Sequence, residues 1–470
     1  MKKILLLSLF GCCVSESSFS QGGSTGIGTT TPHASSVLDV NSNNKGVLFP
    51  RVSTTQRMGI VNPAMGLMVY DTDKRAIFLY DGAQWLPMLS GATNANILPQ
   101  TIAPPDLESG DRLGMSVSIF GDYAVAGCPA PGGTGKAYVY FRNAGMWTQQ
   151  AVLTASDGAS GDEFGTAVAI NGNYAIVGAP KDDVITGTPP FIFNYENKGS
   201  VYIFVRSGST WTQQAKLVSA VTASFQYYGI SVSLEGNHLA VGAIFDTDAG
   251  AVYIYQQNGN IWDLQQKLVS SDGVIYDQFG YSIDLANNYI IVGANVASPT
   301  GAAYIFFFNG IFWMQQQKIT TSGTDFEQGS SVSINDTIAL VGRPNASSGE
   351  IYIQGAANFY RRTGTTWSSM GSTIYAPDGV DQAHFGISLS LYGGYAIIGA
   401  RKGAGPLPGD GTAYIYKKVG NFWQFQQKIN DPTLLTDEFG YAVAIDGFNL
   451  IIGSPYKANL KGGVAFLNIQ

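Results

Sequence analysis

One pattern recurs seven times between residues 112 and 470, and it constrains the fold more than any other feature of the chain. Each copy has a polar turn, a Phe-Gly pair or a variant of it, an alternating strand, a short hairpin turn and a hydrophobic strand that ends near Val-Gly-Ala. Two more strands follow in each copy, so the repeating unit has four strands, a period typical of propellers rather than helical solenoids. The anchoring glycines are Gly114, Gly165, Gly229, Gly280, Gly329, Gly386 and Gly440.

The composition excludes several classes of protein. Of the 470 residues, 45% are hydrophobic and 13% are charged, enough for a large core, yet no stretch after the N-terminus is long and apolar enough to span a membrane. The net charge of -7 leaves no basic stripe, so we expect no nucleic-acid partner. The three histidines, His33, His238 and His384, lie in unlike contexts and indicate neither a His-based metal site nor a catalytic triad.

The first 20 residues have the pattern of a secretory signal. Two lysines precede an apolar run over residues 4–10, and Ser18-Phe19-Ser20 offers a small-x-small cleavage site before Gln21. We therefore expect a secreted or surface-displayed protein whose mature chain begins near Gln21. A competing interpretation reads residues 9–12 as a lipobox, which would place a lipid on Cys12.

Three further segments follow the signal. Residues 21–89 contain short strands broken by Gly, Pro and Asn and predict a β-rich N-terminal arm or stalk. Apolar positions there are too irregular to predict an independent core, so an extended arm and a small folded head both remain open. Residues 90–96 read as a linker, and residues 97–470 as the propeller.

The propeller repeats imply an unusual closure. Six tryptophans open fourth strands, each 16 to 19 residues before the next anchoring glycine, whereas there are seven first strands. Shifting residues 147–157 upstream by 51 residues, the Gly114 to Gly165 spacing, lands on residues 96–106. The missing fourth strand is therefore expected at Ile97–Ala103, ahead of the first repeat. Since the seventh repeat ends after its third strand, this early strand would complete the last blade and cover its open edge.

Phe-Gly near the start of each unit and Gly-Ala-Pro at the end of its second strand resemble the two halves of the FG-GAP repeat. Phe164-Gly165 and Gly178-Ala179-Pro180 are complete, while Gln328-Gly329 is the clearest departure. Residues 97–470 thus resemble the integrin-alpha-like propeller, which implies seven four-stranded blades. Residues 22–89 resemble the leader of exported, tail-fibre-like surface proteins, which implies an arm that can trimerise.

The calcium sites of the integrin-like family do not carry over. In that family an Asp-x-Asp-x-Asp-Gly loop joins the first and second strands, whereas here that place holds short turns such as Asn171-Gly172-Asn173. Too few oxygens are present for the six to eight ligands that calcium takes. We therefore predict neither a metal nor another cofactor.

Candidate catalytic groups are explained better by the repeat. Asp157 with Asp162, and Asp272 with Asp277, could form acid/base pairs, but they recur at one phase and favour strand-entry turns. The Gln-Gln pairs of the fourth strands, such as Gln265-Gln266, read as a solvated outer edge. We predict no enzymatic activity, and a hydrolase is the less favoured class.

The predicted function is binding of an extracellular partner, for adhesion or complex formation. Long loops after the second strands of the second and sixth repeats carry aromatic and charged residues. A lectin-like propeller, with a shallow glycan pocket between each pair of blades, is the alternative. The predicted contact residues are Lys181, Asp182, Phe191, Phe193, Tyr195, Arg343, Arg401 and Lys402.

Overall fold

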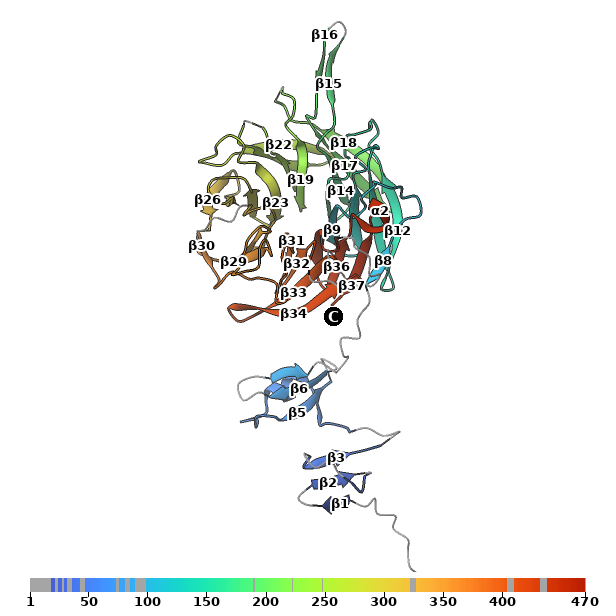
Figure 1. Cartoon of the computed structure of the whole chain (residues 1–470), viewed down its shortest axis with the longest axis vertical. Coiled ribbons are helices and arrows are strands. Elements are labelled where there is room, and N and C mark those ends of the chain that lie inside the picture. Colours follow the sequence, from blue (N-terminus) through green and yellow to red (C-terminus); the bar gives the residue numbers. More distant parts are fainter. Residues whose placement is uncertain are drawn as a thin grey trace, which may run out of the picture. The chain divides into compact units, whose positions relative to one another are not determined.

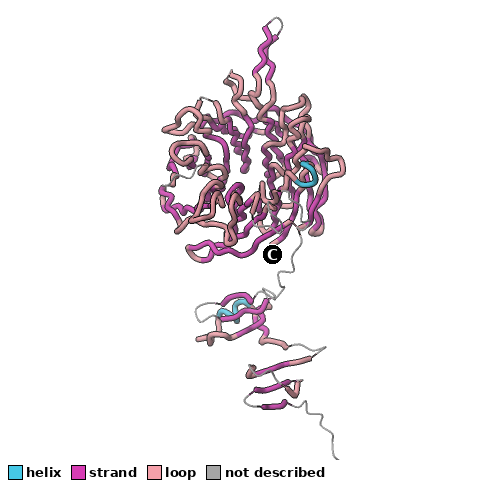
Figure 2. Tube along the Cα trace, viewed as in Figure 1, coloured by secondary structure: helices cyan, strands magenta, loops and turns pink. Residues whose placement is uncertain are grey.

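The structure is a computed structural model of the 470-residue chain. It divides into two compact units, Met1–Asn96 and Ile97–Gln470. Strands dominate both units (Figure 2), which confirms the predicted all-β class. The residues that the structure describes are 18–21, 24–27, 29–31, 36–42, 47–72, 76–80, 85–88, 99–188, 191–221, 223–246, 248–321, 327–403, 410–431 and 438–469.

The N-terminal unit holds two small sheets. An ion pair of 2.8 Å joins Arg57 to Asp71, and the guanidinium of Arg57 lies 3.9 Å from the ring centroid of Phe78. This buried polar centre gives the second sheet a small core, while residues 1–17 of the predicted signal lie outside the described residues. The sheets are β1 (Ser18–Gln21), β2 (Ser24–Ile27) and β3 (Leu38–Val40), then β4 (Arg51–Val52), β5 (Met68–Asp71), β6 (Ala76–Tyr80) and β7 (Trp85–Met88), with helix α1 (Thr54–Met58) between β4 and β5.

The described part of the second unit contains seven four-stranded antiparallel sheets, consistent with propeller blades, and we number them in chain order. Sheets 1 to 4 are β9 (Ser116–Phe120), β10 (Tyr123–Cys128), β11 (Lys136–Asn143) and β12 (Met146–Leu153); β13 (Ala167–Asn171), β14 (Tyr174–Ala179), β17 (Ser200–Ser207) and β18 (Thr210–Leu217); β19 (Tyr228–Glu235), β20 (His238–Ala243), β21 (Ala251–Asn258) and β22 (Ile261–Leu268); β23 (Phe279–Ala286), β24 (Tyr289–Ala294), β25 (Ala302–Phe308) and β26 (Trp313–Ile319).

The last three sheets follow the same plan, with one exception. Sheet 7 takes its fourth strand from the start of the unit, because β8 (Gln100–Ile102) pairs antiparallel with β37. Sheets 5 to 7 are β27 (Val332–Ile334), β28 (Ile338–Arg343), β29 (Ala356–Thr363) and β30 (Thr366–Ser369); β31 (Phe385–Tyr392), β32 (Tyr395–Ala400), β33 (Thr412–Val419) and β34 (Phe422–Asn430); β35 (Ala442–Asp446), β36 (Asn449–Gly453), β37 (Val464–Asn468) and β8, with helix α2 (Lys457–Leu460) before β37.

The first strands of the sheets face one another around a common centre (Figure 1). Each contacts the first strand of the next sheet, and β35 of sheet 7 contacts β9 of sheet 1. Seven hydrophobic clusters of described residues lie between neighbouring sheets, including one where Ile451 and Phe466 of sheet 7 meet Tyr140 of sheet 1. The core is therefore divided into layers that join adjacent sheets.

The two glycines of the repeat meet where neighbouring sheets approach most closely. A Cβ on Gly178, at the end of a second strand, would lie 2.0 Å from the carbonyl oxygen of Gly229 in the next sheet. The same clash would occur at Gly453, whose Cβ would lie 2.0 Å from the oxygen of Gly114. Only glycine leaves room for this backbone contact, which explains why both halves of the repeat carry it.

Serines at the start of the first strands tie neighbouring sheets together. Ser231 Oγ donates a hydrogen bond of 2.6 Å to the carbonyl of Gly280, and Ser388 Oγ one of 2.8 Å to that of Gly440. Equivalent bonds come from Ser116, Ser282 and Ser331, whereas sheets 2 and 7 have Ala167 and Ala442 at this position.

The expectation that the Gln-Gln pairs form a solvated edge holds for Gln149 and Gln426, which are exposed, but not for Gln265 and Gln266. Gln265 accepts from the indole Nε1 of Trp313 in the next sheet at 3.1 Å. Gln266 accepts from the Trp313 backbone N–H at 2.8 Å and donates to its carbonyl at 2.9 Å. These side chains therefore join outer strands, and Gln100 of β8 makes the same pair of backbone bonds to Trp147, at 3.0 and 2.7 Å.

Candidate functional site

The seven sheets present two different ends. Short turns between first and second strands form one end, which we call the hairpin face. The residues before each first strand and after each second strand form the other, which we call the loop face. Hairpin β15 (Val184–Thr188) and β16 (Phe191–Tyr195) extends outward between β14 and β17 (Figure 1).

The loop face carries seven side chains on one repeated backbone conformation. The residue two positions before each anchoring glycine has a positive φ, between 52° and 72°. Non-glycine residues rarely adopt this conformation, and its recurrence in every sheet makes it part of the repeat's turn. The backbone is thus constant while the side chain changes from sheet to sheet. The seven residues are Arg112, Glu163, Tyr227, Gln278, Glu327, His384 and Glu438.

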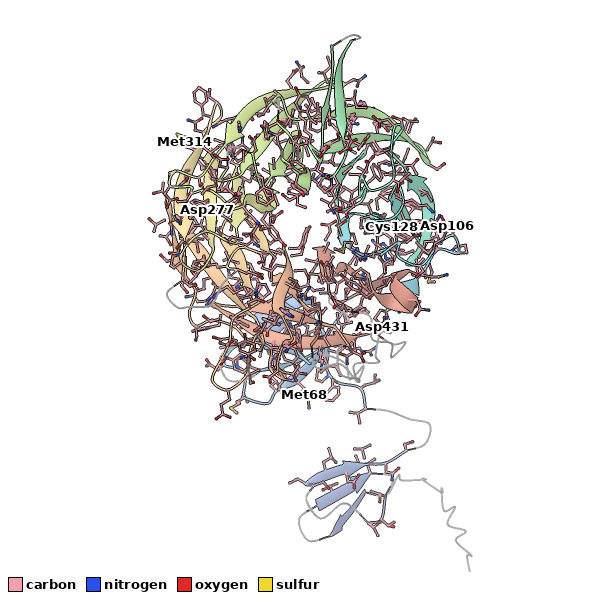
Figure 3. The ribbon with its side chains drawn as sticks, turned by 45° about the horizontal axis from the view of Figure 1, so that its top comes forward. Met68, Asp106, Cys128, Asp277, Met314 and Asp431 are labelled. Atoms are coloured by element: carbon pink, nitrogen blue, oxygen red, sulfur yellow. The ribbon has the colours of Figure 1, made fainter. Side chains whose placement is uncertain are left out.

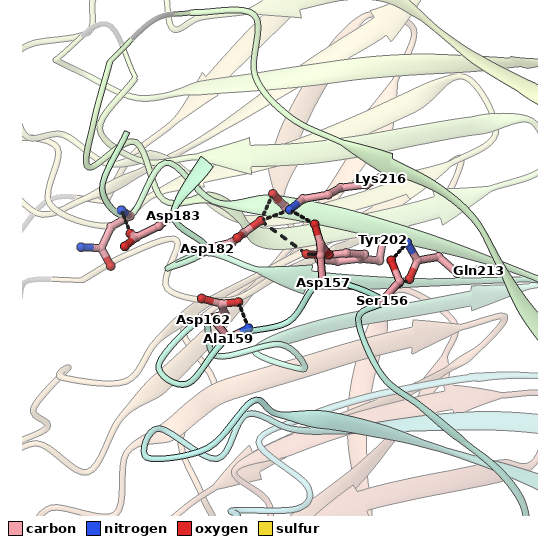
Figure 4. A network of polar contacts seen from close by, with 11 residues as sticks. Ser156, Asp157, Ala159, Asp162, Asp182, Asp183, Tyr202, Gln213 and Lys216 are labelled. Atoms are coloured by element: carbon pink, nitrogen blue, oxygen red, sulfur yellow. Dashed lines mark hydrogen bonds and ion pairs between the residues drawn. The ribbon is translucent and has the colours of Figure 1, made fainter. Parts of the chain in front are cut away.

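Two predicted contact residues lie at the base of the long hairpin and have partners there. Lys181 forms a 2.8 Å ion pair with Glu163. Asp182 is buried and accepts from Ser200 and Tyr202, and its carboxylate lies 2.6 Å from Lys216 Nζ (Figure 4). Asp182 therefore fixes the start of the hairpin from beneath the surface.

The other predicted residues are distributed over the same face. Phe191, Phe193 and Tyr195 belong to β16, and Lys198 Nζ lies 4.9 Å from the Tyr195 ring centroid. The side chains of Phe191 and Phe193 lie outside the described part of the structure. Arg343 ends β28 and is only 5% exposed, whereas Arg401 and Lys402 follow β32 and are half-buried.

Arg401 and Lys402 belong to a group of polar side chains that we call the axial cluster. Arg401 Nη2 lies 3.5 Å from His384 Nε2, and burial together with the charges of Arg401 and Lys402 lowers the pKa of His384 to about 4. Burial raises the pKa of Glu438, which the same two cations oppose. The other members of the axial cluster are Arg112, Tyr281, Glu327, Tyr441 and Tyr456.

The tyrosines of this cluster come from sheets that are not neighbours in the chain. Tyr281 follows the anchoring glycine of sheet 4, and Tyr441 that of sheet 7. Burial, then mainly Tyr456 and Tyr281, raises the pKa of Tyr441 to about 12. Tyr441 and Tyr456 make an edge-on pair with centroids 6.1 Å apart, and the Arg112 guanidinium lies 5.7 Å from the Tyr456 centroid. Side chains from non-adjacent sheets therefore lie near one another at the centre of the loop face, which we call the mouth.

A second group on the loop face, the aromatic patch, was missed from the sequence. It consists of Phe225, Tyr227, Phe245 and Tyr276, with ring centroids 5.6 Å apart for Tyr227 and Phe245 and 6.3 Å for Phe245 and Tyr276. Phe225 is 49% and Tyr276 63% exposed, and both have positive φ, as does Tyr227. Tyr227 occupies the repeated position two residues before Gly229, where the side chain varies, and the other three lie in connections that carry no periodic signal.

A cavity of about 510 Å³ is lined by the first strands of all seven sheets. Asp284 lies on its wall, where Ser118, Ser233, Ser333 and Ser390 occupy the equivalent position in other sheets. Its carboxylate accepts from Ser333 Oγ at 2.9 Å and from the Ile334 N–H at 2.8 Å. Burial is the largest cause raising the pKa of Asp284, to about 7.

The aspartates weighed as catalytic pairs hold structural positions. Asp157 accepts from the Tyr202 hydroxyl at 2.9 Å and pairs with Lys216 at 2.8 Å, and Asp272 does the same with Tyr304 and Lys318. Asp162 accepts the Ala159 N–H at 2.6 Å. Their engagement in repeated contacts agrees with strand-entry turns.

Further candidate features are the free cysteine, possible metal sites and possible membrane spans. Cys128 is fully buried, its Sγ lies 3.3 Å from the Asp111 carbonyl, and burial raises its pKa (Figure 3). Within the described ranges, no group of three or more His, Cys, Asp or Glu residues could hold a metal ion. No helix among the described residues is long and apolar enough to cross a membrane.

Comparison with protein families identifies the chain. The FG-GAP repeat model matches residues 99–140, 147–204, 211–255, 262–306 and 367–416, which together make up more than half of the chain. The chain therefore belongs to the FG-GAP repeat family. A phage tail-like trimerisation region matches residues 26–100, which confirms the resemblance of the arm to tail-fibre-like leaders.

The fold also resembles solved structures of distant sequence. A chain from a crystal structure of the mitotic checkpoint complex matches with a TM-score of 0.50 and 12% identity, over 80% of this chain and 92% of that one. At this identity the likeness concerns the fold alone. No curated protein matches the sequence significantly.

Proposed function

We propose that this chain is an exported, non-enzymatic binding protein whose C-terminal unit is a closed seven-bladed propeller. Closure is supported by the cycle of contacts among first strands and by the pairing of β8 with β37. The contact between Gly453 and Gly114, and the bonds between Gln100 and Trp147, repeat at the junction of sheets 7 and 1 what other junctions contain. A closed ring would be a rigid support for loops at either end.

The loop face is the proposed binding surface, and its partner is an extracellular protein. The observation that carries this proposal is the change of side chain from sheet to sheet on a constant αL backbone. On such a surface the backbone serves as a constant scaffold and the varying side chains can recognise a partner, as in repeat proteins with variable loops on one face. The exposed aromatic patch and the charged axial cluster supply the residue types that dominate protein interfaces.

Export and oligomerisation complete the proposal. The signal-like residues 1–20 favour secretion or surface display, with cleavage near Gln21. The trimerisation region favours display of several propellers on one stalk, which raises avidity without any new contact.

Glycan binding is the second candidate, and the exposed rings of Phe225 and Tyr276 favour it, because sugars stack on such surfaces. A pull-down with the purified chain, run beside a glycan array, separates the two. A protein recovered with one site per propeller supports the proposal. Glycan binding with one equivalent site per blade junction would replace it with the lectin alternative, and no binding in either format would refute it.

A further inference from the structure

We infer that the axial cluster is a carboxylate-binding site, which receives an acidic side chain of a partner polypeptide. The inference deepens the proposed function and rests on it in one respect, namely that the partner is a protein. It concerns the loop face, where Arg401 and Lys402 lie near Glu438, and where Arg112 lies 5.7 Å from the ring centroid of Tyr456, which packs edge-on against Tyr441.

The cations of the axial cluster are incompletely matched by the acids near them. Among the described residues, Nε of Arg112 and Nε of Arg401 are buried and have no hydrogen-bond partner. Arg401 Nη2 lies 3.5 Å from the imidazole of His384, which is neutral at pH 7 because its pKa is held at about 4. Both side chains are half-buried, so an incoming carboxylate would meet their Nη groups, which can donate to it as a planar fork.

The acidic members of the cluster do not satisfy these cations. Burial raises the pKa of Glu438 even though Arg401 and Lys402 lie near, and its Oε2 makes no hydrogen bond with described residues. Glu327 and Arg401 both lie near Tyr281, whose pKa Glu327 raises and Arg401 lowers. The local excess of cations contrasts with the net charge of -7 for the whole chain.

Tyrosine hydroxyls supply neutral donors around the same point. Burial raises the pKa values of Tyr281 and Tyr441, so both hydroxyls stay protonated at neutral pH and can donate to an incoming oxygen. Tyr281 is 37% exposed, which leaves the mouth accessible. The Tyr456 ring below Arg112 limits the directions in which that guanidinium can point. Cations and hydroxyls together therefore fit an anionic, planar group.

The test uses the full-length chain and two probe peptides, acetyl-tetraglutamate amide and acetyl-tetraglutamine amide, in titration calorimetry at low salt. We expect the glutamate peptide to bind at least tenfold more tightly than the glutamine peptide. Arg401→Gln should weaken glutamate-peptide binding about tenfold, since it removes a charge-assisted pair. Arg401→Lys should recover part of the loss, because it keeps the charge without the fork.

A matched control removes a cation from the opposite end of the ring. Arg362 lies on the hairpin face, where its Nε donates to the Asp336 carbonyl at 2.7 Å, and Arg362→Gln should leave the affinity unchanged. Equal affinity for the two peptides, no detectable glutamate-peptide binding, or equal weakening by Arg362→Gln and Arg401→Gln would overturn the inference. Glutamate-peptide binding with no partner in a pull-down would instead leave this site standing while the proposed function fails.

Discussion

Removal of strand β8 tests whether closure of the proposed propeller depends on it. A chain that begins at Pro104 lacks β8, whereas one that begins at Ile97 keeps it, and both retain the rest of the second unit. Loss of β8 removes three residue pairs with β37, the two hydrogen bonds between Gln100 and Trp147, and the partly buried side chain of Ile102. It also leaves the edge of β37 unpaired, which invites aggregation.

The structure sets the size of the effect. About four hydrogen bonds at about 1 kcal/mol each, and about 1 kcal/mol for Ile102, give a loss of about 5 kcal/mol. For a unit of this size that corresponds to a fall in Tm of about 6 °C. Calorimetric melting of the two chains measures it. Equal melting temperatures would refute the reasoning.

A point substitution in β8 tests the contribution of its side-chain hydrogen bonds without removing the strand. Gln100→Ala should cost about 2 kcal/mol, because it leaves the N–H and carbonyl of buried Trp147 without partners. Gln149→Ala, at an exposed position of the neighbouring outer strand β12, should cost almost nothing. Denaturant unfolding of both variants in the full chain provides the comparison, and equal stabilities would contradict the role of Gln100.

Three other predictions concern the ring itself. Gly178→Ala should destabilise by more than about 3 kcal/mol in denaturant unfolding, because its Cβ would lie 2.0 Å from the Gly229 oxygen, whereas Gly172→Ala, in an open turn, should cost about 1 kcal/mol; equal costs would contradict the close approach. Chelation should leave Tm unchanged, and a rise of several degrees in millimolar calcium would reveal a site that we do not expect. The pKa of Asp284 is raised in the folded chain to about 7, so the folded chain binds more protons than the unfolded one and stability should fall between about pH 4 and 7. Asp284→Ser should remove this fall and stabilise at pH 8 by about 2 kcal/mol, since about 4 kcal/mol from the raised pKa is offset by about 2 kcal/mol for the two lost hydrogen bonds. An unaltered pH profile would count against it.

The fold could be predicted from the sequence because glycines recur at fixed positions of the repeat. Gly114 to Gly440 mark the first strands, and the phase of the tryptophans places a strand near Ile97–Ala103, where β8 is Gln100–Ile102. A β-strand is readable from its period and its bounding turns. The roles of the Gln-Gln pairs could not be predicted in this way. Gln266 and Trp313 are 47 residues apart, and only the packing of neighbouring sheets brings them together.

The candidate site was predicted less completely, for physical reasons. Charged residues after β14 and β32 were found because their connections are long, and Arg401 and Lys402 do lie in the axial cluster. The length of a loop does not indicate which of its side chains are buried. The ion pair between Asp182 and Lys216 could therefore not be predicted from the sequence. In the aromatic patch only Tyr227 occupies a repeated position, and the other members lie in connections of variable length that the packing of the sheets brings together.

Hydrogen exchange of the full-length chain with and without its recovered partner tests the central claim most directly. We expect protection of loop-face segments that contain residues 181–199, 223–228 and 401–403, with the hairpin-face turns at 120–123 and 171–174 unchanged. Protection confined to the hairpin face, or to the outer strands, would contradict a binding surface on the loop face.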